Sequence, residues 1–502
     1  MWNKIKHLLF RNVSPRQTIA KNTFWLGIAN VGGRLTRAVI IIYSARVLGA
    51  ADWGIFSYMV SLVAFIEVFT DVGISPIFVR ETAKLHHEPE RKKQILSTSF
   101  YLKLVLLLLG VLAAVFIAPH FIASYNAVTR TVLYLVIFIL AFDTVRDFGF
   151  SIIRAQEKMQ WEAGLYLFMN VAIVVFGFLS LYLSRSVVAF TFAYALGTGV
   201  GMIATVYALR HELAGIFSNF STKLTNYIVK SAWPLAVSSV MAVLMINTDI
   251  LIIGWLNSVS DVGLYSAAQR IVQLLYLLPS VMNISLLPTF ARLAKTDDQK
   301  LRATLETVLS ALFMIAIPIA IGGFILGREI TLLVFGSGYL GSTTSFRILI
   351  LTILIDFPAT ILTSFIFAYN EQKKLTIYAA IGGISNVLFD LILIPRFGIA
   401  GSAVSTFTAQ LLSQAYLRTT AKRINHYRVL PRLTRVFSAA ALMTLVVLAL
   451  KLFAVPVVLI IAAGGLIYLG ALVLLREPLV REAKLILRPA ASALPEESGS
   501  LS

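Results

Sequence analysis

Cysteine is absent from this 502-residue chain, and charged side chains are scarce. Without cysteine no disulfide can form, which excludes a disulfide-stapled scaffold. Asp, Glu, Lys and Arg make up only 13% of the residues, roughly half of their share in soluble proteins. Acids are the scarcer kind, since 24 Asp and Glu stand against 43 Lys and Arg, a formal net charge of +19. This balance excludes an acidic disordered chain and leaves two explanations for the basic excess, nucleic-acid binding or membrane topology.

The signatures of common enzymes are also missing. The sequence contains no Gly-Lys-Ser/Thr phosphate loop and no His-Glu-x-x-His metal pair, so we expect no ATP hydrolysis within the chain and no metal site. Gly197-Thr-Gly-Val-Gly201 lies inside an apolar run and does not predict a dinucleotide site. We therefore predict a protein that is not an enzyme and that carries no cofactor.

Apolar residues are abundant, at 58% of the chain. Fourteen runs are long enough to cross a hydrocarbon core of about 30 Å: residues 23–45, 54–78, 96–118, 128–150, 161–184, 187–209, 227–255, 263–289, 303–326, 345–368, 375–394, 399–418, 433–453 and 455–475. The runs do not alternate between polar and apolar residues, so each predicts a helix, which satisfies its own backbone hydrogen bonds. The predicted fold is an all-α polytopic membrane protein with about 14 transmembrane helices.

The basic residues are distributed among the connections in a regular way. Of the 43, 32 lie in the N-terminal segment, the even-numbered connections and the C-terminal tail, whereas six lie in the odd-numbered connections. A nucleic-acid footprint would instead gather on one patch. By the positive-inside rule, both termini are predicted to be cytoplasmic, in a multi-pass protein of the cell inner membrane.

An internal repeat divides the chain. Asp52-Trp-Gly-Ile-Phe-Ser57 resembles Asp261-Val-Gly-Leu-Tyr-Ser266, and four further matches recur at offsets between 208 and 214. Two six-helix lobes of the same orientation follow, which is typical of alternating-access transporters with a substrate site between their halves. The predicted divisions are a basic cytoplasmic N-terminus (1–20), an N-lobe (21–210), a cytoplasmic linker (211–226), a C-lobe (227–420), two additional spans (421–475) and a cytoplasmic, disordered tail (476–502).

Ionisable residues inside the first two spans are predicted to share a depth in the membrane. Folding this hairpin about residue 52 places Arg37 level with Glu67, and Arg34 level with Asp71. Charged groups at such depths are expensive and usually functional.

The same geometry recurs in the second half, where Asp249 and Arg270 are almost equidistant from residue 259. Two interpretations of these three pairs remain open. Each pair is either a structural salt bridge, or its arginine faces a central cavity and binds an anionic substrate while the acid neutralises the arginine in the empty state. Guanidinium suits the second task because it stays charged and binds phosphate with two parallel hydrogen bonds.

Further acids within spans are Asp143, Asp356 and Asp390. Any of them could carry a coupling proton or sodium ion, but local pairing, such as Asp143 with Arg146 at i, i+3, is favoured. The spacing Gly197-x-x-x-Gly201 is interpreted as close internal packing rather than as a dimer face.

Several segments resemble a known family. "ARVLGAADWGIFSYMVSLVAFIEVFTDVGISPIFVRE" (45–81) resembles the opening hairpin of polysaccharide flippases of the multidrug/oligosaccharidyl-lipid/polysaccharide exporter superfamily. "TDILIIGWLNSVSDVGLYSAAQRI", "LPSVMNISLLPTFARLAK" and "LILIPRFGIAGSAVSTFTAQ" are similar to parts of their second half. The O-antigen-type (Wzx-like) flippases are the nearest relatives by this resemblance, and the lipid II (MurJ) and MATE branches are more distant.

The resemblance implies two six-helix lobes around a V-shaped central cavity and an oligosaccharide substrate on a polyprenyl diphosphate carrier. It assigns Arg34, Arg37 and Arg270 as the cavity cations that bind the diphosphate. The acids Glu67, Asp71 and Asp249 are a departure from the family pattern, and their depth in the spans predicts that they are paired or coupling acids. We expect a flippase that moves lipid-diphosphate-linked repeat units to the outer leaflet for cell-surface polysaccharide synthesis, without ATP and with coupling to an H⁺ or Na⁺ gradient left open. Expected partners are this substrate, membrane lipids, a polysaccharide polymerase and a chain-length regulator, and no nucleic acid.

The alternatives are a cation-coupled MATE-like exporter of small amphipathic molecules, a lipid II flippase, and a non-transporting scaffold for polysaccharide assembly.

Overall fold

The computed structural model describes residues 15–85, 88–122, 125–246 and 248–479, and within these ranges it contains helices and no strand. The predicted all-α class is therefore confirmed. Most of the predicted tail (476–502) and of the basic N-terminus (1–20) lies outside the described residues.

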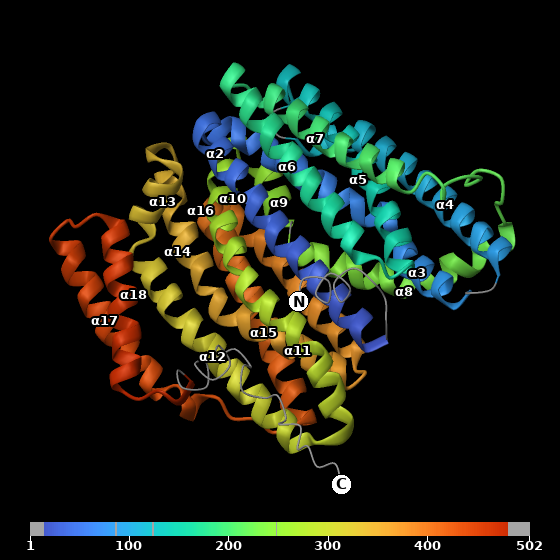
Figure 1. The fold of residues 1–502 in the computed structure, drawn as a ribbon. Coiled ribbons are helices and arrows are strands. Elements are labelled where there is room, and N and C mark those ends of the chain that lie inside the picture. Colours follow the sequence, from blue (N-terminus) through green and yellow to red (C-terminus); the bar gives the residue numbers. More distant parts are fainter. Residues whose placement is uncertain (1–14, 86–87, 123–124, 247, 480–502) are drawn as a thin grey trace, which may run out of the picture.

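The first half of the chain, the N-half, contains six helices and one 3-10 turn within its described residues (Figure 1). These are α2 (Pro15–Asp71), α3 (Ile74–Lys84), α4 (Pro89–Phe116), η1 (Ala118–Phe121), α5 (Ala127–Ala155), α6 (Met159–Leu183) and α7 (Val187–Ala208). Local sequence sets several of their boundaries. Asn126 caps α5 in a reciprocal arrangement with Thr129, which satisfies two backbone donors at the helix start.

The second half of the chain, the C-half, runs from α8 to α16. Its elements are α8 (Thr222–Ile246), α9 (Thr248–Leu256), α10 (Val259–Leu275), α11 (Leu277–Thr296), α12 (Asp298–Ile325), α13 (Gly327–Phe335), η2 (Ser337–Ser342), α14 (Thr343–Leu351), α15 (Ile353–Ala368) and α16 (Gln372–Ile424). The short η3 (Leu430–Arg432) leads to α17 (Thr434–Leu452) and α18 (Val457–Leu474), which pack together and lie against α12 at the edge of the C-half (Figure 1).

Eleven helices in the described residues are long and apolar enough to cross a membrane, or up to twelve if a bent pair from Val259 to Thr296 counts as one span. Two of the eleven, α2 and α16, are too long for a single crossing and are broken by left-handed glycines, Gly49 and Gly398. Glycine adopts this conformation without the steric penalty that a Cβ brings. A break of this kind lets each of the two helices cross twice, and the total of about fourteen crossings stays a prediction.

The two halves meet where the internal repeat is strongest. Ser57 and Ser266, which occupy equivalent positions in the repeat, share a hydrogen bond of 3.2 Å between their hydroxyl oxygens. Beside them, a Cβ on Gly54 would collide with the Val259 carbonyl, and a Cβ on Gly263 would collide with the Ala50 carbonyl. Equivalent residues that touch each other are what a two-fold axis between α2 and α10 requires.

The spacing Gly197-x-x-x-Gly201 lies inside the N-half, where a Cβ at either glycine would press on Ile173 or Met169 of α6. The interpretation as close internal packing is confirmed.

Candidate functional site

A cavity of about 690 Å³ lies between the two halves and is called the central cavity here. Side chains from α2 and α6 line one side of it, and side chains from α8, α10, α11, α15 and α16 line the other. The lining residues are Arg34, Arg37, Ala38, Ile41, Ile42, Tyr166, Met245, Arg270, Gln273, Leu274, Tyr276, Ser280, Asp356, Ala359, Thr360, Thr363, Tyr378 and Gln410. The structure thus brings all three predicted cavity cations together, although they come from different halves.

Arg37 is held in place by the N-half. Its Nε donates to Asn170 Oδ1 at 2.9 Å, and its guanidinium carbon lies 5.9 Å from the ring centroids of both Tyr166 and Tyr194. A neutral amide and two aromatic faces orient the cation without cancelling its charge. Gly33 permits the close approach, because a Cβ there would collide with Tyr166.

Arg270 comes from the C-half and is less completely bonded. One terminal nitrogen donates to Gln273 Oε1 at 3.1 Å, whereas its buried Nε has no hydrogen-bond partner. A buried donor without an acceptor is costly, so the Arg270 guanidinium is less well satisfied by the protein than that of Arg37. Arg34 is exposed and lines the same cavity.

Among the described residues that line the central cavity, Asp356 is the only carboxylate. It accepts a hydrogen bond of 2.5 Å from the hydroxyl of Tyr276. The cavity therefore holds three guanidinium groups and one carboxylate, which makes its lining net cationic. From the sequence, Asp356 was predicted only as an acid within a span and was not assigned to this site. Sequence analysis did not identify Asn170, Tyr276 or Gln273 as part of the site.

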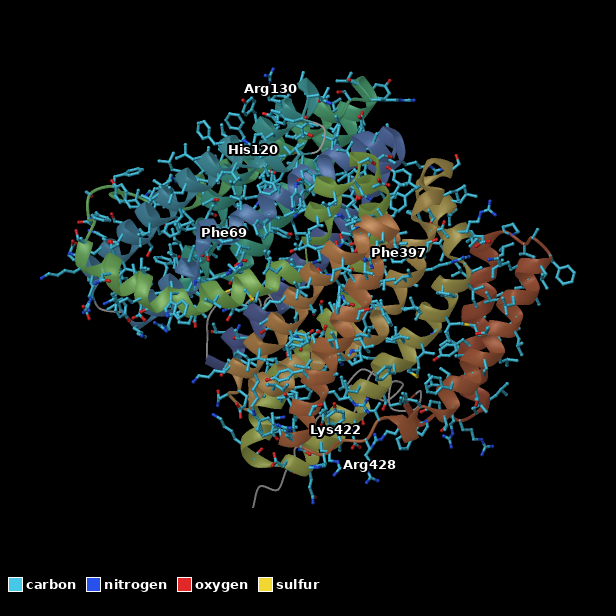
Figure 2. The ribbon with its side chains drawn as sticks, turned by 180° about the vertical axis from the view of Figure 1, so that it is seen from behind. Phe69, His120, Arg130, Phe397, Lys422 and Arg428 are labelled. Carbon is cyan, nitrogen blue, oxygen red and sulfur yellow. The ribbon has the colours of Figure 1, made fainter. Side chains whose placement is uncertain are left out.

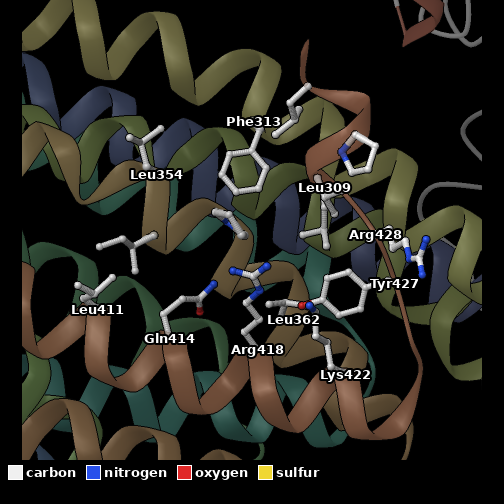
Figure 3. Close-up of a pocket in the computed structure, with 15 residues that line it drawn as sticks. Leu309, Phe313, Leu354, Leu362, Leu411, Gln414, Arg418, Lys422, Tyr427 and Arg428 are labelled. Carbon is white, nitrogen blue, oxygen red and sulfur yellow. The ribbon is translucent and has the colours of Figure 1, made fainter. Parts of the chain in front are cut away.

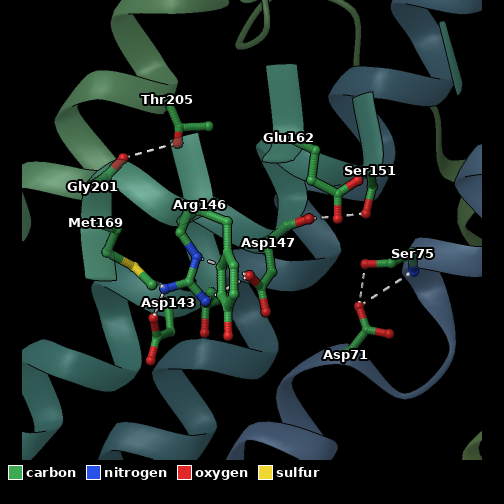
Figure 4. Close-up of polar contacts among 12 residues, drawn as sticks. Asp71, Ser75, Asp143, Arg146, Asp147, Ser151, Glu162, Met169, Gly201 and Thr205 are labelled. Carbon is green, nitrogen blue, oxygen red and sulfur yellow. Dashed lines mark hydrogen bonds and ion pairs between the residues drawn. The ribbon is translucent and has the colours of Figure 1, made fainter. Parts of the chain in front are cut away.

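A second set of ionisable residues lies inside the N-half and is called the N-half network (Figure 4). Arg146 forms ion pairs with Asp143 and with Asp147, the second at 2.7 Å. The predicted pairing of Asp143 with Arg146 is confirmed. Lys103 and Arg154 complete the cations of the network, and each has its own carboxylate: Lys103 pairs with Asp71 at 2.7 Å and Arg154 with Glu162 at 2.5 Å.

The predicted pairing of Arg34 with Asp71 is wrong, since Asp71 instead pairs with Lys103 of α4 and also accepts from Ser75. Arg37 likewise bonds to Asn170 and not to Glu67. Glu67 and Asp71 line a pocket of about 330 Å³ beside the N-half network. The depth estimate did not reveal which face of each helix points to which neighbour.

Asp249 and Arg270 do not pair either. The Asp249 carboxylate accepts from the Tyr265 hydroxyl at 2.7 Å, from Gln269 Nε2 at 2.9 Å and from the Ile250 amide at 2.9 Å. Gln269 and Arg270 are successive residues of α10, so their side chains diverge by about 100° around the helix. Gln269, on one face of α10, donates to Asp249, while Arg270 on another face lines the central cavity.

Asp249 belongs to a buried polar cluster in the C-half. The hydroxyl of Tyr265 also lies 3.2 Å from Thr406 Oγ1, which Asn386 Nδ2 approaches at 3.4 Å. Asp390, one helical turn beyond Asn386, is fully buried, and neither carboxylate oxygen has a hydrogen-bond partner in the described structure. Unpartnered carboxylate and amide oxygens suit a proton or a hard cation, but no group of three or more His, Cys, Asp or Glu that could hold a metal occurs among the described residues.

Known proteins resemble this chain in both sequence and fold. A family model described as "Polysaccharide biosynthesis protein" matches residues 19–294, and a second model, MatE, matches residues 234–392. The chain is 25% identical over 396 residues to the "Probable low-salt glycan biosynthesis flippase Agl15" of Haloferax volcanii, covering 77% of this chain and 80% of that protein. It is 20% identical over 404 residues to a "Putative O-antigen transporter" of Shigella flexneri, covering 77% of this chain and 94% of that protein.

Among solved structures, the fold is similar to "Lipid II flippase MurJ, inward closed conformation". The TM-score is 0.73 at 18% identity, over 91% of this chain and 99% of that one. An inward-facing MATE family multidrug transporter matches with a TM-score of 0.61 at 14% identity, over 80% of this chain and 98% of that one. These relatives are transporters and flippases, which agrees with the prediction that the chain is not an enzyme.

Proposed function

The chain belongs to the polysaccharide biosynthesis protein family, and from this premise we propose that it flips lipid-diphosphate-linked oligosaccharide repeat units from the cytoplasmic to the outer leaflet of the inner membrane. The relatives named as a glycan biosynthesis flippase and an O-antigen transporter support this class of substrate. The product would supply cell-surface polysaccharide synthesis.

The observation that carries the proposal is the convergence of Arg34, Arg37 and Arg270 on one cavity that contains a single carboxylate. A diphosphate is a compact anion with many acceptor oxygens, and arginine binds such groups with paired N–H donors. Arg37 and Arg270 line the cavity and hydrogen-bond to neutral amide side chains, Asn170 and Gln273, so their charge remains for the diphosphate. The lining threonines and glutamines add hydrogen-bonding groups for sugar hydroxyls.

Alternating access is supported by where the halves touch. Besides the Gly54 and Gly263 contacts, Tyr339 donates to the Ala45 carbonyl at 2.6 Å and Arg46 donates to the Leu333 carbonyl at 3.2 Å. These contacts all cluster near the turn at Gly49. With the predicted cytoplasmic termini, that turn is external, so this structure corresponds to a state closed on the outside. Rocking of the two halves about the cavity would open the outer side.

The buried polar cluster around Asp249 is the proposed coupling site, because the unpartnered carboxylate oxygens of Asp390 beside it can take up a proton or a sodium ion. Moving one elementary charge through 100 mV releases about 2.3 kcal/mol, enough to bias a two-state carrier. No ATP is required in this mechanism.

Two transport alternatives differ in cargo. A cation-coupled exporter of small amphipathic molecules requires an acid-lined cavity, which the three arginines of the central cavity disfavour. A lipid II flippase would use the same arginines for the same diphosphate, and only the choice of glycan separates it from the proposed function. The third alternative, a non-transporting scaffold, predicts that the arginines are dispensable.

The test is a flipping assay with the full chain in liposomes. Fluorescent polyprenyl-diphosphate oligosaccharide, lipid II and a cationic amphipathic dye are offered separately, and the translocated fraction is measured by quenching of the exposed probe. We expect flipping of the oligosaccharide carrier and a loss of at least about tenfold in Arg37→Ala and Arg270→Ala, equivalent to about 1.4 kcal/mol.

Arg130→Ala serves as the matched control, because Arg130 is an exposed arginine outside the central cavity. Unchanged flipping in both cavity variants would contradict the role of the arginines and favour the scaffold. Preferential movement of the cationic dye would favour the exporter, and preference for lipid II would favour the lipid II flippase.

A further inference from the structure

A second pocket, of about 440 Å³, lies on the other side of α15 from the central cavity (Figure 3). It is bounded by α12, α15, the end of α16 and the segment 427–433, and it is called the α15 back pocket here. Asp356, Thr360 and Thr363 of α15 line the central cavity, whereas Leu354, Pro358 and Leu362 line the α15 back pocket. The helix therefore separates the two spaces.

Three cations surround one end of the α15 back pocket. Arg418 and Lys422 lie one helical turn apart on α16, and Arg428 lies in the segment that follows α16 (Figure 3). All three are exposed, and no ion pair of theirs occurs in the described part of the chain. The neighbouring carboxylate, Glu306, is already bonded to the side chains of Arg302 and Arg432. Glu306 also accepts a hydrogen bond from the Arg428 backbone amide at 2.8 Å. The mouth of the pocket thus carries three cationic side chains that form no ion pair with the described carboxylates.

The rest of the α15 back pocket is mostly apolar, with Gln414 and Tyr427 as polar lining residues, and it runs along α16. From Lys422 to Leu411 the wall of α16 advances eleven residues, or about 16 Å. This is about half of a hydrocarbon core of ~30 Å, the depth of one leaflet. Leu309, Phe313 and Leu354 are among its apolar lining residues, and Leu354 lies on the side of Leu411 in Figure 3. Figure 2 places Lys422 and Arg428 at the end of the molecule opposite Arg130, as expected of residues at a membrane surface.

We propose that the α15 back pocket binds an anionic phospholipid of the leaflet into which α16 ends. The phosphate lies among Arg418, Lys422 and Arg428, and one acyl chain occupies the apolar part. A free anion would need the cations but not a trough one leaflet deep, and a neutral lipid would need the trough but not the cations. The lipid is not the cargo, because α15 separates it from the central cavity. The proposal does not depend on which glycan the protein moves.

The test measures lipid binding to the purified full chain in detergent, by native mass spectrometry. Phosphatidylglycerol is compared with phosphatidylcholine of the same acyl chains, and inorganic phosphate is added as a competitor. We expect tighter binding of phosphatidylglycerol that millimolar phosphate does not displace. The combined variant Arg418→Gln, Lys422→Gln and Arg428→Gln weakens phosphatidylglycerol binding by about tenfold or more, as expected for three interfacial cations.

The matched control is Lys300→Gln, Lys373→Gln and Arg423→Gln, which removes three exposed cations without touching the α15 back pocket. A second pair of variants tests the acyl chain. Leu411→Trp narrows the trough from an exposed position, whereas Leu412→Trp adds the same bulk outside the lining. We expect several-fold weaker binding only in the first.

Three results would overturn the proposal. One is equal phosphatidylglycerol affinity in the pocket and control triple variants. The others are full displacement by inorganic phosphate, which would indicate a free-anion site, and equal binding by Leu411→Trp and Leu412→Trp. The single variants Arg418→Gln and Arg428→Gln, at exposed positions, keep the test valid if the triple variant does not yield monodisperse protein.

Discussion

The N-half network and the central cavity both hold arginines at membrane depth, yet they neutralise charge in opposite ways. In the N-half network each of Arg146, Lys103 and Arg154 has at least one carboxylate partner. In the central cavity Arg37 is held by an amide and two aromatic rings, and the single carboxylate, Asp356, is bonded to a tyrosine.

This difference indicates what each set of charges does. A paired ion inside a helical bundle fixes the packing of the helices that carry it, and breaking the pair leaves a buried charge behind. An unpaired cation adds little to folding but can bind an anion that arrives later. We therefore expect substitutions in the N-half network to reduce stability, and substitutions in the central cavity to reduce transport.

The largest effect is expected for Arg146→Ala. Arg146 is buried and bridges Asp143 and Asp147, so its removal leaves two uncompensated acids and costs about 3–5 kcal/mol. The thermal midpoint and the yield of monodisperse protein should both fall sharply. Normal stability of this variant would contradict the structural role that we assign to the N-half network.

The next largest effect concerns Lys103, which is buried and pairs with Asp71. Lys103→Met should destabilise the protein by about 2 kcal/mol, because Asp71 loses its cation. Adding Asp71→Leu should restore at least half of the lost stability, since the pair acts as a unit. Strictly additive losses in the thermal midpoint would show that the two residues do not interact.

Arg270→Leu should separate stability from function in the opposite direction. The buried Nε of Arg270 has no acceptor, so an apolar replacement should change stability by less than about 1 kcal/mol, towards greater stability. Flipping of the polyprenyl-diphosphate carrier should still fall. A large drop in the thermal midpoint would place Arg270 with the structural charges.

The smallest effect is expected for Arg34→Gln. Arg34 is exposed, and solvent screening limits such a charge to a stability contribution below about 0.5 kcal/mol. Flipping should decline only a few-fold, and the decline should shrink at high ionic strength. A salt-independent loss as large as that of Arg37→Ala would show that Arg34 binds the substrate directly.

Much of the fold could be predicted because hydropathy reports directly on helices in a membrane. The apolar runs correspond to the helices, and the repeat matched Ser57 with Ser266, two residues that the structure brings into contact. The runs could not reveal that the helix after residue 54 ends at Asp71 and continues as α3, because the break occurs at Val72 and Gly73, in left-handed backbone within an apolar stretch.

The candidate site was anticipated only in part. Arg34, Arg37 and Arg270 do line one cavity, but the acids assigned to them lie elsewhere. The same comparison of distances from a turn could have predicted one observed pair, because Asp71 and Lys103 are equidistant from residue 87, in the connection between their two helices. The Arg37 and Asn170 contact had no such signal, since the two residues lie on spans that are not consecutive.

The sequence by itself determined that the chain is an all-helical membrane protein and where most of its helices run, because hydropathy reports directly on the segments that can cross a membrane. Only the tertiary structure decided which charges meet. In lipid nearly every face of a helix is apolar, so the periodicity that would orient a helix in a soluble protein is weak, and rotation and neighbours are set by packing. The predicted depth placed Arg37 level with Glu67, whereas in the folded structure Arg37 hydrogen-bonds to Asn170.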